Sequence, residues 1–540
     1  MTSSGSDLNC GRKSPATSPQ APILLDLTKS IIAPLFGIAI YCGILFSGMF
    51  LSDPDTYWHI ATGQWMLSQH SVPRYDPFSF TVSGRPWVDG EWLSQLVLAL
   101  VYQNGGWRAL VLFTTIVVFL TFALLYRQLA TILRENIALG VAAVLIVFAF
   151  FNFLARPHVL SFPIIVLWTA HLARASEQSR LPPLWLLPLM VLWANLHGGF
   201  TLGLLLTVAF GADAAIAAKA PERKRIVTFW IAFFVCALLA SFVTPYGYKP
   251  IVETLRVFQL GETLNWIGEM RAVSFQSELF HGIILLILLG LALVFGARLR
   301  PARVVLLLGL LLLAFMHVRG LALVALTAPF IVSYDLKKQF PSLGHSDDQI
   351  VIRFERFGRV VKSVSWAAFA ASICAATVSY VLFKSNETPR AQITPAAAVD
   401  YAKAHLSGPV LNSYNFGGYL IFRGIKTFVD GRQLLFGRAF VTELVGATSV
   451  GGLNRLEMLA DKYKICWTLF EANSIPAFYL DHSANWERMY ADEIAVVHVR
   501  RRREPMREAA EAVASPPHTA CEGVAAMPAA KSPSSTIPPQ

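Results

Sequence analysis

The sequence predicts an α-helical polytopic membrane protein of about eleven transmembrane helices with a small α/β domain at its C-terminal end. Hydrophobic residues make up 55% of the 540 residues and charged residues only 15%, whereas a soluble protein has about 25% charged residues. The apolar residues gather into runs of roughly 17–25 residues, which is the length that crosses a bilayer as a helix. Only residues 394–500 alternate short strand-like and helical stretches, as a compact α/β domain does.

Basic residues in the short loops between the apolar runs predict the topology. The positive-inside rule places such loops in the cytoplasm. The N-terminus is then cytoplasmic, and the C-terminal domain lies on the periplasmic side of the inner (plasma) membrane. The predicted spans are residues 31–51, 109–126, 137–154, 159–173, 184–197, 200–217, 226–243, 281–297, 304–317, 320–334 and 364–383.

Composition divides the chain into four parts. Residues 1–30 are a polar, disordered cytoplasmic tail, and residues 504–540 are a second disordered tail. Residues 31–383 form the membrane domain, whose first outer loop is 52–108, and residues 388–503 form the soluble domain. Its expected strands are Pro409–Tyr414, Thr427–Val429, Cys466–Phe470 and Ala495–Val499, and its expected helices are Pro395–His405 and Leu453–Tyr463.

Residues 91–103 can form either a further span or a helix lying at the membrane interface. A further crossing would place Arg127 and Arg134 outside the cell. We therefore prefer the interfacial helix.

The net charge of +11 does not indicate a nucleic-acid partner. The basic residues lie between apolar runs, and neither zinc-finger spacing nor an aromatic–basic repeat is present. The six cysteines contain no CxxC pair, so we expect neither a disulfide framework nor a cysteine metal site.

Ten polar residues gather on the predicted outer side of the membrane. Polar groups at span ends or inside spans are costly and are often functional, so they predict an outward-facing polar site. They are Asp53, Asp55, His59, Arg156, His158, Asn195, His197, Glu269, His317 and Arg319.

The two aspartates follow the first span directly, within Ser52-Asp-Pro-Asp-Thr-Tyr-Trp-His59. We expect an interfacial helix to begin here, anchored by aromatic residues. Asp53 can serve as its N-cap and Asp55 can complement the helix dipole. Either carboxylate can also act as a catalytic base, and the two roles are compatible.

This region resembles the GT-C superfamily of glycosyltransferases. The resemblance rests on Asp53-Pro-Asp-Thr-Tyr-Trp-His59, Asp76-Pro-Phe-Ser79 and Glu91-Trp-Leu93. It implies a multi-span fold, a lipid-phosphate-linked sugar donor and a catalytic aspartate in the first outer loop. Pro54 departs from the Asp-Glu pair of several branches.

The C-terminal region is similar to a soluble tail on uncharacterised members of that superfamily. The matching stretches are Asn412-Ser-Tyr-Asn-Phe-Gly-Gly-Tyr419 and Phe428-Val-Asp-Gly-Arg432. Asp430 and Arg432 either bind a glycan or form a structural turn, because Asp-Gly is a common turn pair.

The chemistry expected of such an enzyme assigns roles to these residues. Inverting transfer needs a carboxylate that takes the acceptor's proton. The resemblance favours Asp53 over Asp55, because the spacing of Asp53 to Tyr57 and Ile60 is similar to that of Asp-rich starts in the superfamily. A forked arginine can bind the donor phosphate. The residues assigned to substrate or phosphate binding are His59, Arg156, His158, Asn195, His197, Glu269, His317 and Arg319.

Several of these residues have an alternative structural explanation. Arg156 and Arg319 can extend to lipid headgroups. His197 can make a hydrogen bond within a turn, His59 can either orient Asp55 or lie at the interface, and Glu269 can be a solvated loop charge.

The leading hypothesis is a membrane glycosyltransferase that moves a sugar from a polyprenyl-phosphate donor to a glycan, lipid or protein acceptor outside the cytoplasm. The alternatives are a transporter or flippase of lipid-linked sugars and a non-enzymatic membrane scaffold. No cofactor is required by the sequence, although a carboxylate pair can hold a divalent cation, Mg²⁺ or Mn²⁺.

Overall fold

The computed structural model describes residues 35, 37–257, 272–273, 279–344, 369–382 and 388–501. The predicted tails 1–30 and 504–540 lie outside these residues, as does Glu269.

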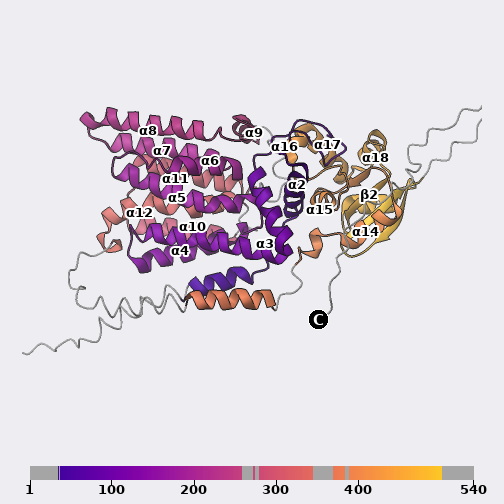
Figure 1. Cartoon of the computed structure of the whole chain (residues 1–540), viewed down its shortest axis with the longest axis horizontal. Coiled ribbons are helices and arrows are strands. Elements are labelled where there is room, and N and C mark those ends of the chain that lie inside the picture. Colours follow the sequence, from indigo (N-terminus) through magenta and orange to yellow (C-terminus); the bar gives the residue numbers. More distant parts are fainter. Residues whose placement is uncertain are drawn as a thin grey trace, which may run out of the picture.

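The membrane domain is a bundle of helices that run side by side along the long axis of the molecule (Figure 1). Helix α2 and the C-terminal domain lie at one end of this bundle. The helices of the membrane domain are α2 (Asp55–Gln69), α3 (Trp92–Leu129), α4 (Glu135–Ala149), α5 (Pro157–Glu177), α6 (Leu186–Leu196), α7 (Phe200–Ala217), α8 (Ala220–Ala240), α9 (Lys249–Val257), α10 (Leu279–Val294), α11 (Pro301–Met316) and α12 (Gly320–Gln339), with short 3₁₀ turns at Phe150–Asn152 and Pro341–Leu343.

The first and last helices of the membrane domain are neighbours. Residues 37–45 are helical and lie beside the helix Phe369–Leu382. The Tyr41 hydroxyl and the Thr377 hydroxyl are 2.8 Å apart. The chain therefore enters and leaves the membrane domain along the same side of the bundle.

Four helices in the described part of the chain are long and apolar enough to cross a membrane, namely α3, α5, α7 and α12. Five further apolar helices of 10–17 residues accompany them. The prediction of a mostly helical chain with apolar helices of membrane-spanning length and a small C-terminal sheet is confirmed. Each predicted span overlaps a helix, but the count of eleven spans is not confirmed.

Helix α3 has two parts. Its backbone is not helical at Gly105 and Gly106, so the segment before them forms a separate helical arm. This arm packs closely on α2, where a Cβ atom on Gly63 would overlap the carbonyl oxygen of Gln95. It corresponds to the segment 91–103 that the sequence predicts to be interfacial.

A buried ionic cluster ties four helices together at the far end of the bundle. Arg303 of α11 is 1% exposed. Its guanidinium lies 2.9 Å from Glu177, 3.0 Å from Asp213 and 3.2 Å from Asp335. Burying one charge is tolerable only when partners compensate it, and here α5, α7 and α12 each supply a carboxylate.

The C-terminal domain is a four-stranded sheet covered by helices on both faces. The strand order is β1-β2-β4-β3, with β1 parallel to β2 and the other two pairs antiparallel. Its elements are η5 (Ala391–Ile393), α14 (Ala396–His405), β1 (Val410–Asn412), α15 (Tyr414–Phe422), α16 (Gln433–Phe436), α17 (Arg438–Thr448), α18 (Leu453–Lys462), β2 (Trp467–Glu471), α19 (Ile475–Asp481), β3 (Trp486–Ala491) and β4 (Ala495–Arg500).

Alternation along the strands gives the sheet its two apolar faces. Val410, Leu469 and Val497 pack with α14 and α15. Leu411 and Phe470, on the opposite face, pack with α17, α18 and α19. Such two-sided burial explains why the apolar runs of β1 and β2 were recognisable in the sequence.

The sequence identified three of the four strands and made two errors. Thr427–Val429 is not a strand, since only one bridge forms there, between Ser79 and Thr427. Strand β3 was missed because it is an edge strand whose residues are mostly exposed. The sequence of this strand, with Glu487 and Arg488 side by side, does not alternate between apolar and polar residues as a half-buried strand does.

The loop Phe428–Arg432 connects the C-terminal domain to the first outer loop of the membrane domain. Arg432 is buried and donates to Asp76 (2.6 Å) and to Asp430 (2.7 and 2.8 Å). Its guanidinium also lies over the Trp87 ring, 4.8 Å from the ring centroid. These contacts favour the structural turn over glycan binding.

We predict that Arg432→Ala destabilises the protein strongly. It would leave Asp76 and Asp430 buried without their counter-charge, which typically costs about 3–5 kcal/mol. Thermal unfolding of the purified protein in lipid measures the effect. The control is Lys462→Ala, which removes an exposed ion pair with Glu443 (3.0 Å) and should shift the unfolding temperature far less, because an exposed ion pair contributes little to stability. Equal, small shifts for the two variants would contradict the structural role of Arg432.

Candidate active site

Two carboxylates and one guanidinium form the centre of the candidate site. Arg156 Nη1 lies 3.1 Å from Asp53 Oδ2, and Arg156 Nη2 lies 2.9 Å from Asp55 Oδ2. The three side chains are only 11–14% exposed. One arginine fork therefore holds both aspartates that the sequence singled out, and we call these residues the Asp53–Arg156–Asp55 cluster.

The backbone around the cluster explains its geometry. Asp53 Oδ1 accepts a hydrogen bond from the Asp55 amide (2.8 Å), just where α2 begins. The Thr56 hydroxyl donates to the Ala155 carbonyl (3.2 Å). Pro157 is the first residue of α5, which fixes Arg156 in an extended conformation. Asp53 thus helps to start the helix and also carries charge.

Helix α2 differs from the interfacial helix that the sequence predicts. Tyr57 is 2% exposed and Trp58 is 6% exposed. Tyr57 packs edge-on against Tyr419 of α15, with ring centroids 5.0 Å apart. The aromatic residues are therefore core contacts between the membrane domain and the C-terminal domain, and they do not anchor α2 in lipid.

Glu91 joins two of the predicted histidines to the site. The Gly199 amide donates to His197 Nδ1 (3.0 Å), so Nε2 carries the proton and faces Glu91 Oε1 at 3.3 Å. Glu91 Oε2 lies 3.9 Å from His59 Nδ1. The sequence signal for Glu91 is its place in Glu91-Trp-Leu93, which does not by itself indicate a contact with the two histidines.

His59 is fully buried and neutral. Burial first, and then the charge of Arg156, hold the pKa of its imidazole well below the usual value. Its contact with Glu91 is therefore not an ion pair. Neither ring nitrogen has a hydrogen-bond partner within the described residues, and such groups need a ligand or water to satisfy them.

Asp89 is a second buried carboxyl group close to Glu91. Its Oδ1 atom accepts from the Glu91 amide (3.1 Å) and from Gln95 (3.0 Å). Burial, followed by the charge of Glu91, raises the pKa of Asp89 to about 8. Asp89 is consequently mostly protonated at neutral pH.

The C-terminal domain packs directly on the start of α2. A Cβ atom on Gly431 would overlap Asp55 Oδ1 and would lie 2.6 Å from Trp58 Nε1. A Cβ atom on Gly418 would overlap the Pro54 carbonyl oxygen. Only glycine permits such an approach, so the two glycines bring the C-terminal domain into contact with the aspartates.

Tyr414 also faces the aspartates from the C-terminal domain. Burial, and then the charge of Asp55, raise the pKa of its phenol well above the usual value. It therefore stays protonated at any physiological pH. No local pattern in the sequence connects Tyr414 or Gly431 with Asp55, because the contact forms only when the domains pack.

The remaining predicted residues in the described part of the chain are His158, Asn195, His317 and Arg319. His158 is one residue beyond Pro157, and its Nε2 atom donates to the Asn152 carbonyl (3.0 Å). Its ring centroid is 6.3 Å from that of His197. His317 and Arg319 lie in the turn between α11 and α12, and their substrate-binding roles stay predictions.

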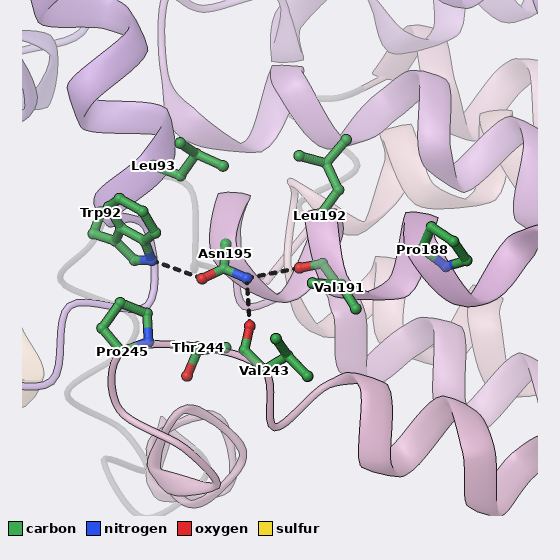
Figure 2. A pocket seen from close by; sticks show the side chains of 9 residues that line it. All are labelled: Trp92, Leu93, Pro188, Val191, Leu192, Asn195, Val243, Thr244 and Pro245. Carbon is green, nitrogen blue, oxygen red and sulfur yellow. Dashed lines mark hydrogen bonds between the residues drawn. The ribbon is translucent and has the colours of Figure 1, made fainter.

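Asn195 lines an open groove of about 540 Å³ beside the site (Figure 2). Its Oδ1 atom accepts from Trp92 Nε1 (2.8 Å), and its amide donates to the Val191 and Val243 carbonyls (2.8 and 2.9 Å). These bonds hold three walls of the groove together. A structural role thus accounts for Asn195. The groove is otherwise lined mainly by apolar side chains, among them Leu93, Pro188, Leu192 and Pro245.

No family model matches the chain, and no curated protein matches its sequence. Among solved structures, it is similar to AglB, an archaeal oligosaccharyltransferase from Archaeoglobus fulgidus, in complex with an inhibitory peptide and a dolichol-phosphate. The identity is 10% and the TM-score 0.50, over 90% of this chain and 75% of that chain. The apo form of the Archaeoglobus fulgidus oligosaccharyltransferase has 10% identity and a TM-score of 0.48, over 83% of this chain and 69% of that chain.

ArnT from Cupriavidus metallidurans bound to undecaprenyl phosphate gives 11% identity and a TM-score of 0.44, over 89% of this chain and 98% of that chain. At these identities the similarity concerns the fold. The likeness to AglB shows that the chain shares the fold of that oligosaccharyltransferase.

We predict that Gly431→Ala abolishes most of the protein's activity without unfolding it. The added methyl group would push the loop away from Asp55 and Trp58. Thermal unfolding and an activity assay together measure this. The control is Gly446→Ala in the same domain, where a methyl group would meet only the end of the flexible Arg455 side chain. Unchanged activity of Gly431→Ala would mean that the loop does not contribute to the site.

Proposed function

We propose that the protein is an integral-membrane glycosyltransferase. It moves a sugar from a polyprenyl-phosphate donor to an acceptor hydroxyl on the periplasmic side of the inner membrane, with inversion at the anomeric carbon. The observation that carries this proposal is the buried Asp53–Arg156–Asp55 cluster at the start of α2, in a chain that shares the fold of an oligosaccharyltransferase.

The geometry favours Asp55 as the base, although the sequence favoured Asp53. Asp53 uses one oxygen for the Asp55 amide and the other for Arg156. Asp55 gives Oδ2 to Arg156 and turns Oδ1 toward Gly431 and Trp58, where the two domains meet. We therefore assign the base to Asp55, the carboxylate that lies where α2 meets the C-terminal domain, and we assign Asp53 to the start of the helix.

The proposed reaction needs little acid catalysis. The acceptor oxygen attacks the anomeric carbon while Asp55 takes the hydroxyl proton. The bond between the anomeric carbon and the phosphate oxygen breaks, and its electron pair leaves with the polyprenyl phosphate. The leaving phosphate needs positive charge or hydrogen-bond donors, and His197 and Arg319 are the candidates for this role.

The apolar groove beside Trp92 suits the lipid part of the donor. It begins one residue from Glu91 and is lined mostly by apolar side chains. Transfer of isoprenoid units from water to apolar surroundings is favourable. The dolichol-phosphate bound to AglB and the undecaprenyl phosphate bound to ArnT are lipids of this class.

We predict that Asp55→Asn lowers the transfer rate by a factor on the order of 10²–10⁴. Asn keeps the size of the side chain but cannot accept the proton at neutral pH. Donor binding should change far less, because a base acts chiefly in the transition state. The assay is transfer of labelled sugar from polyprenyl phosphate by purified protein in lipid.

Two further variants sharpen this test. Asp53→Asn should keep the helix start, because Asn caps as well as Asp, and should have the smaller effect. Asp400→Asn, at an exposed carboxylate of the C-terminal domain, should be silent. If Asp53→Asn and Asp55→Asn both keep normal turnover where the wild type is active, the aspartates are caps and the catalytic assignment is wrong.

A further inference from the structure

The pair Asp53 and Asp55 looks at first like a site for a divalent cation. Mg²⁺ and Mn²⁺ bind carboxylate oxygens, and Mg²⁺ is often held by one or two carboxylates together with substrate phosphates. A glycosyltransferase that handles a phosphate-linked donor can use such a cation.

Arg156 occupies the position that such a cation would need. Its Nη1 and Nη2 atoms lie 3.1 Å and 2.9 Å from one oxygen of each carboxylate. A metal bridging the aspartates would have to bind the same two oxygens, at the much shorter distance of about 2.0–2.1 Å for Mg²⁺. A divalent ion on these two oxygens would compete with the arginine fork for the same atoms and would be repelled by its positive charge.

The other two carboxylate oxygens do not offer a second binding position. Asp53 Oδ1 accepts the Asp55 amide at 2.8 Å. Asp55 Oδ1 faces Gly431 so closely that a methyl group there would overlap it. Mg²⁺ usually keeps several of its waters, and the contact with Gly431 leaves no room for a hydrated ion on that side.

Arg156 is also held in place by the backbone on each side of it. The Ala155 amide donates to the Phe50 carbonyl (2.9 Å), and the Ala155 carbonyl accepts from Thr56 (3.2 Å). Pro157 begins α5 directly after it. The guanidinium is thus presented to the aspartates by two anchored segments, and within the described residues no group of three or more His, Cys, Asp or Glu is arranged to hold a metal.

We propose that Arg156 is the built-in cation of this site, and that the wild-type site takes neither Mg²⁺ nor Mn²⁺. The guanidinium supplies the positive charge that keeps two buried carboxylates together. A corollary is that removing Arg156 converts the aspartate pair into a divalent-cation site. The inference deepens the proposed function, but metal binding can be measured without any transfer assay.

The test is Mn²⁺ binding to the purified full-length protein in lipid nanodiscs, followed by electron paramagnetic resonance. The wild type and Arg156→Lys should hold no Mn²⁺ at the aspartates. Arg156→Ala should bind one Mn²⁺, and the double variant Arg156→Ala/Asp55→Asn should lose it again. Aspartate-dependent Mn²⁺ binding by the wild type would overturn the proposal, whether or not Arg156→Ala folds. A folded Arg156→Ala that binds no Mn²⁺ would overturn the corollary.

Transfer assays extend the test. Wild-type transfer should be unchanged by a chelator. Arg156→Ala should lose a factor on the order of 10²–10³ in rate and should regain part of it with added guanidinium, but not with urea. Loss of wild-type transfer in the chelator, restored by Mn²⁺, would contradict a built-in cation. If no donor supports transfer while the Mn²⁺ results hold, only the proposed function fails.

Discussion

The pairing of Arg156 with Asp53 and Asp55 is the interaction on which the arrangement of the site depends. Three charges lie in a largely buried place, and buried charges are tolerated only when their partners are held in good geometry. That geometry comes from segments far apart in the sequence, the end of the first helix and the start of α5, joined through Phe50, Thr56 and Ala155. The net charge of the cluster is negative, which suits a group that accepts a proton better than one that binds a phosphate directly.

The C-terminal domain belongs to this site as one of its walls. Gly431 and Tyr414 approach Asp55, while Arg432 ties the same loop to Asp76 in the first outer loop. Arg432, which binds Asp76, directly follows Gly431, which contacts Asp55. A shift of this loop would therefore also change the surroundings of Asp55. Glu91, His59 and His197 form a second polar group of the site, and neither ring nitrogen of His59 has a hydrogen-bond partner among the described residues. The site is thus assembled from the first outer loop, the start of α5, the turn before α7 and the C-terminal domain.

The sequence predicted those features that local pattern determines. Apolar runs located the helices, two-sided burial marked β1 and β2, and the polar residues at span ends included Arg156, His59 and His197. Features that depend on packing escaped it. The sequence predicts that Tyr57 and Trp58 anchor α2 in lipid, but both are buried between the two domains. The spacing of apolar residues shows that one face of a helix is covered, and it does not show whether lipid or protein covers that face. Nothing in the sequence around Gly431 indicates a role in the site, because that role comes only from its close contact with Asp55 in the folded protein. Glu91 stood in a recognised motif, yet its function depends on two histidines brought close by the fold.

The central claim is that sugar transfer takes place where α2, α5 and the C-terminal domain meet. The most direct measurement is an electron cryo-microscopy structure of the full-length protein in nanodiscs with a non-transferable phosphonate analogue of a polyprenyl-phosphate sugar. The account predicts that the isoprenoid chain lies in the groove beside Trp92 and that the anomeric carbon faces Asp55. A donor bound at the opposite end of the bundle, beside Arg300 and Arg303, would contradict it.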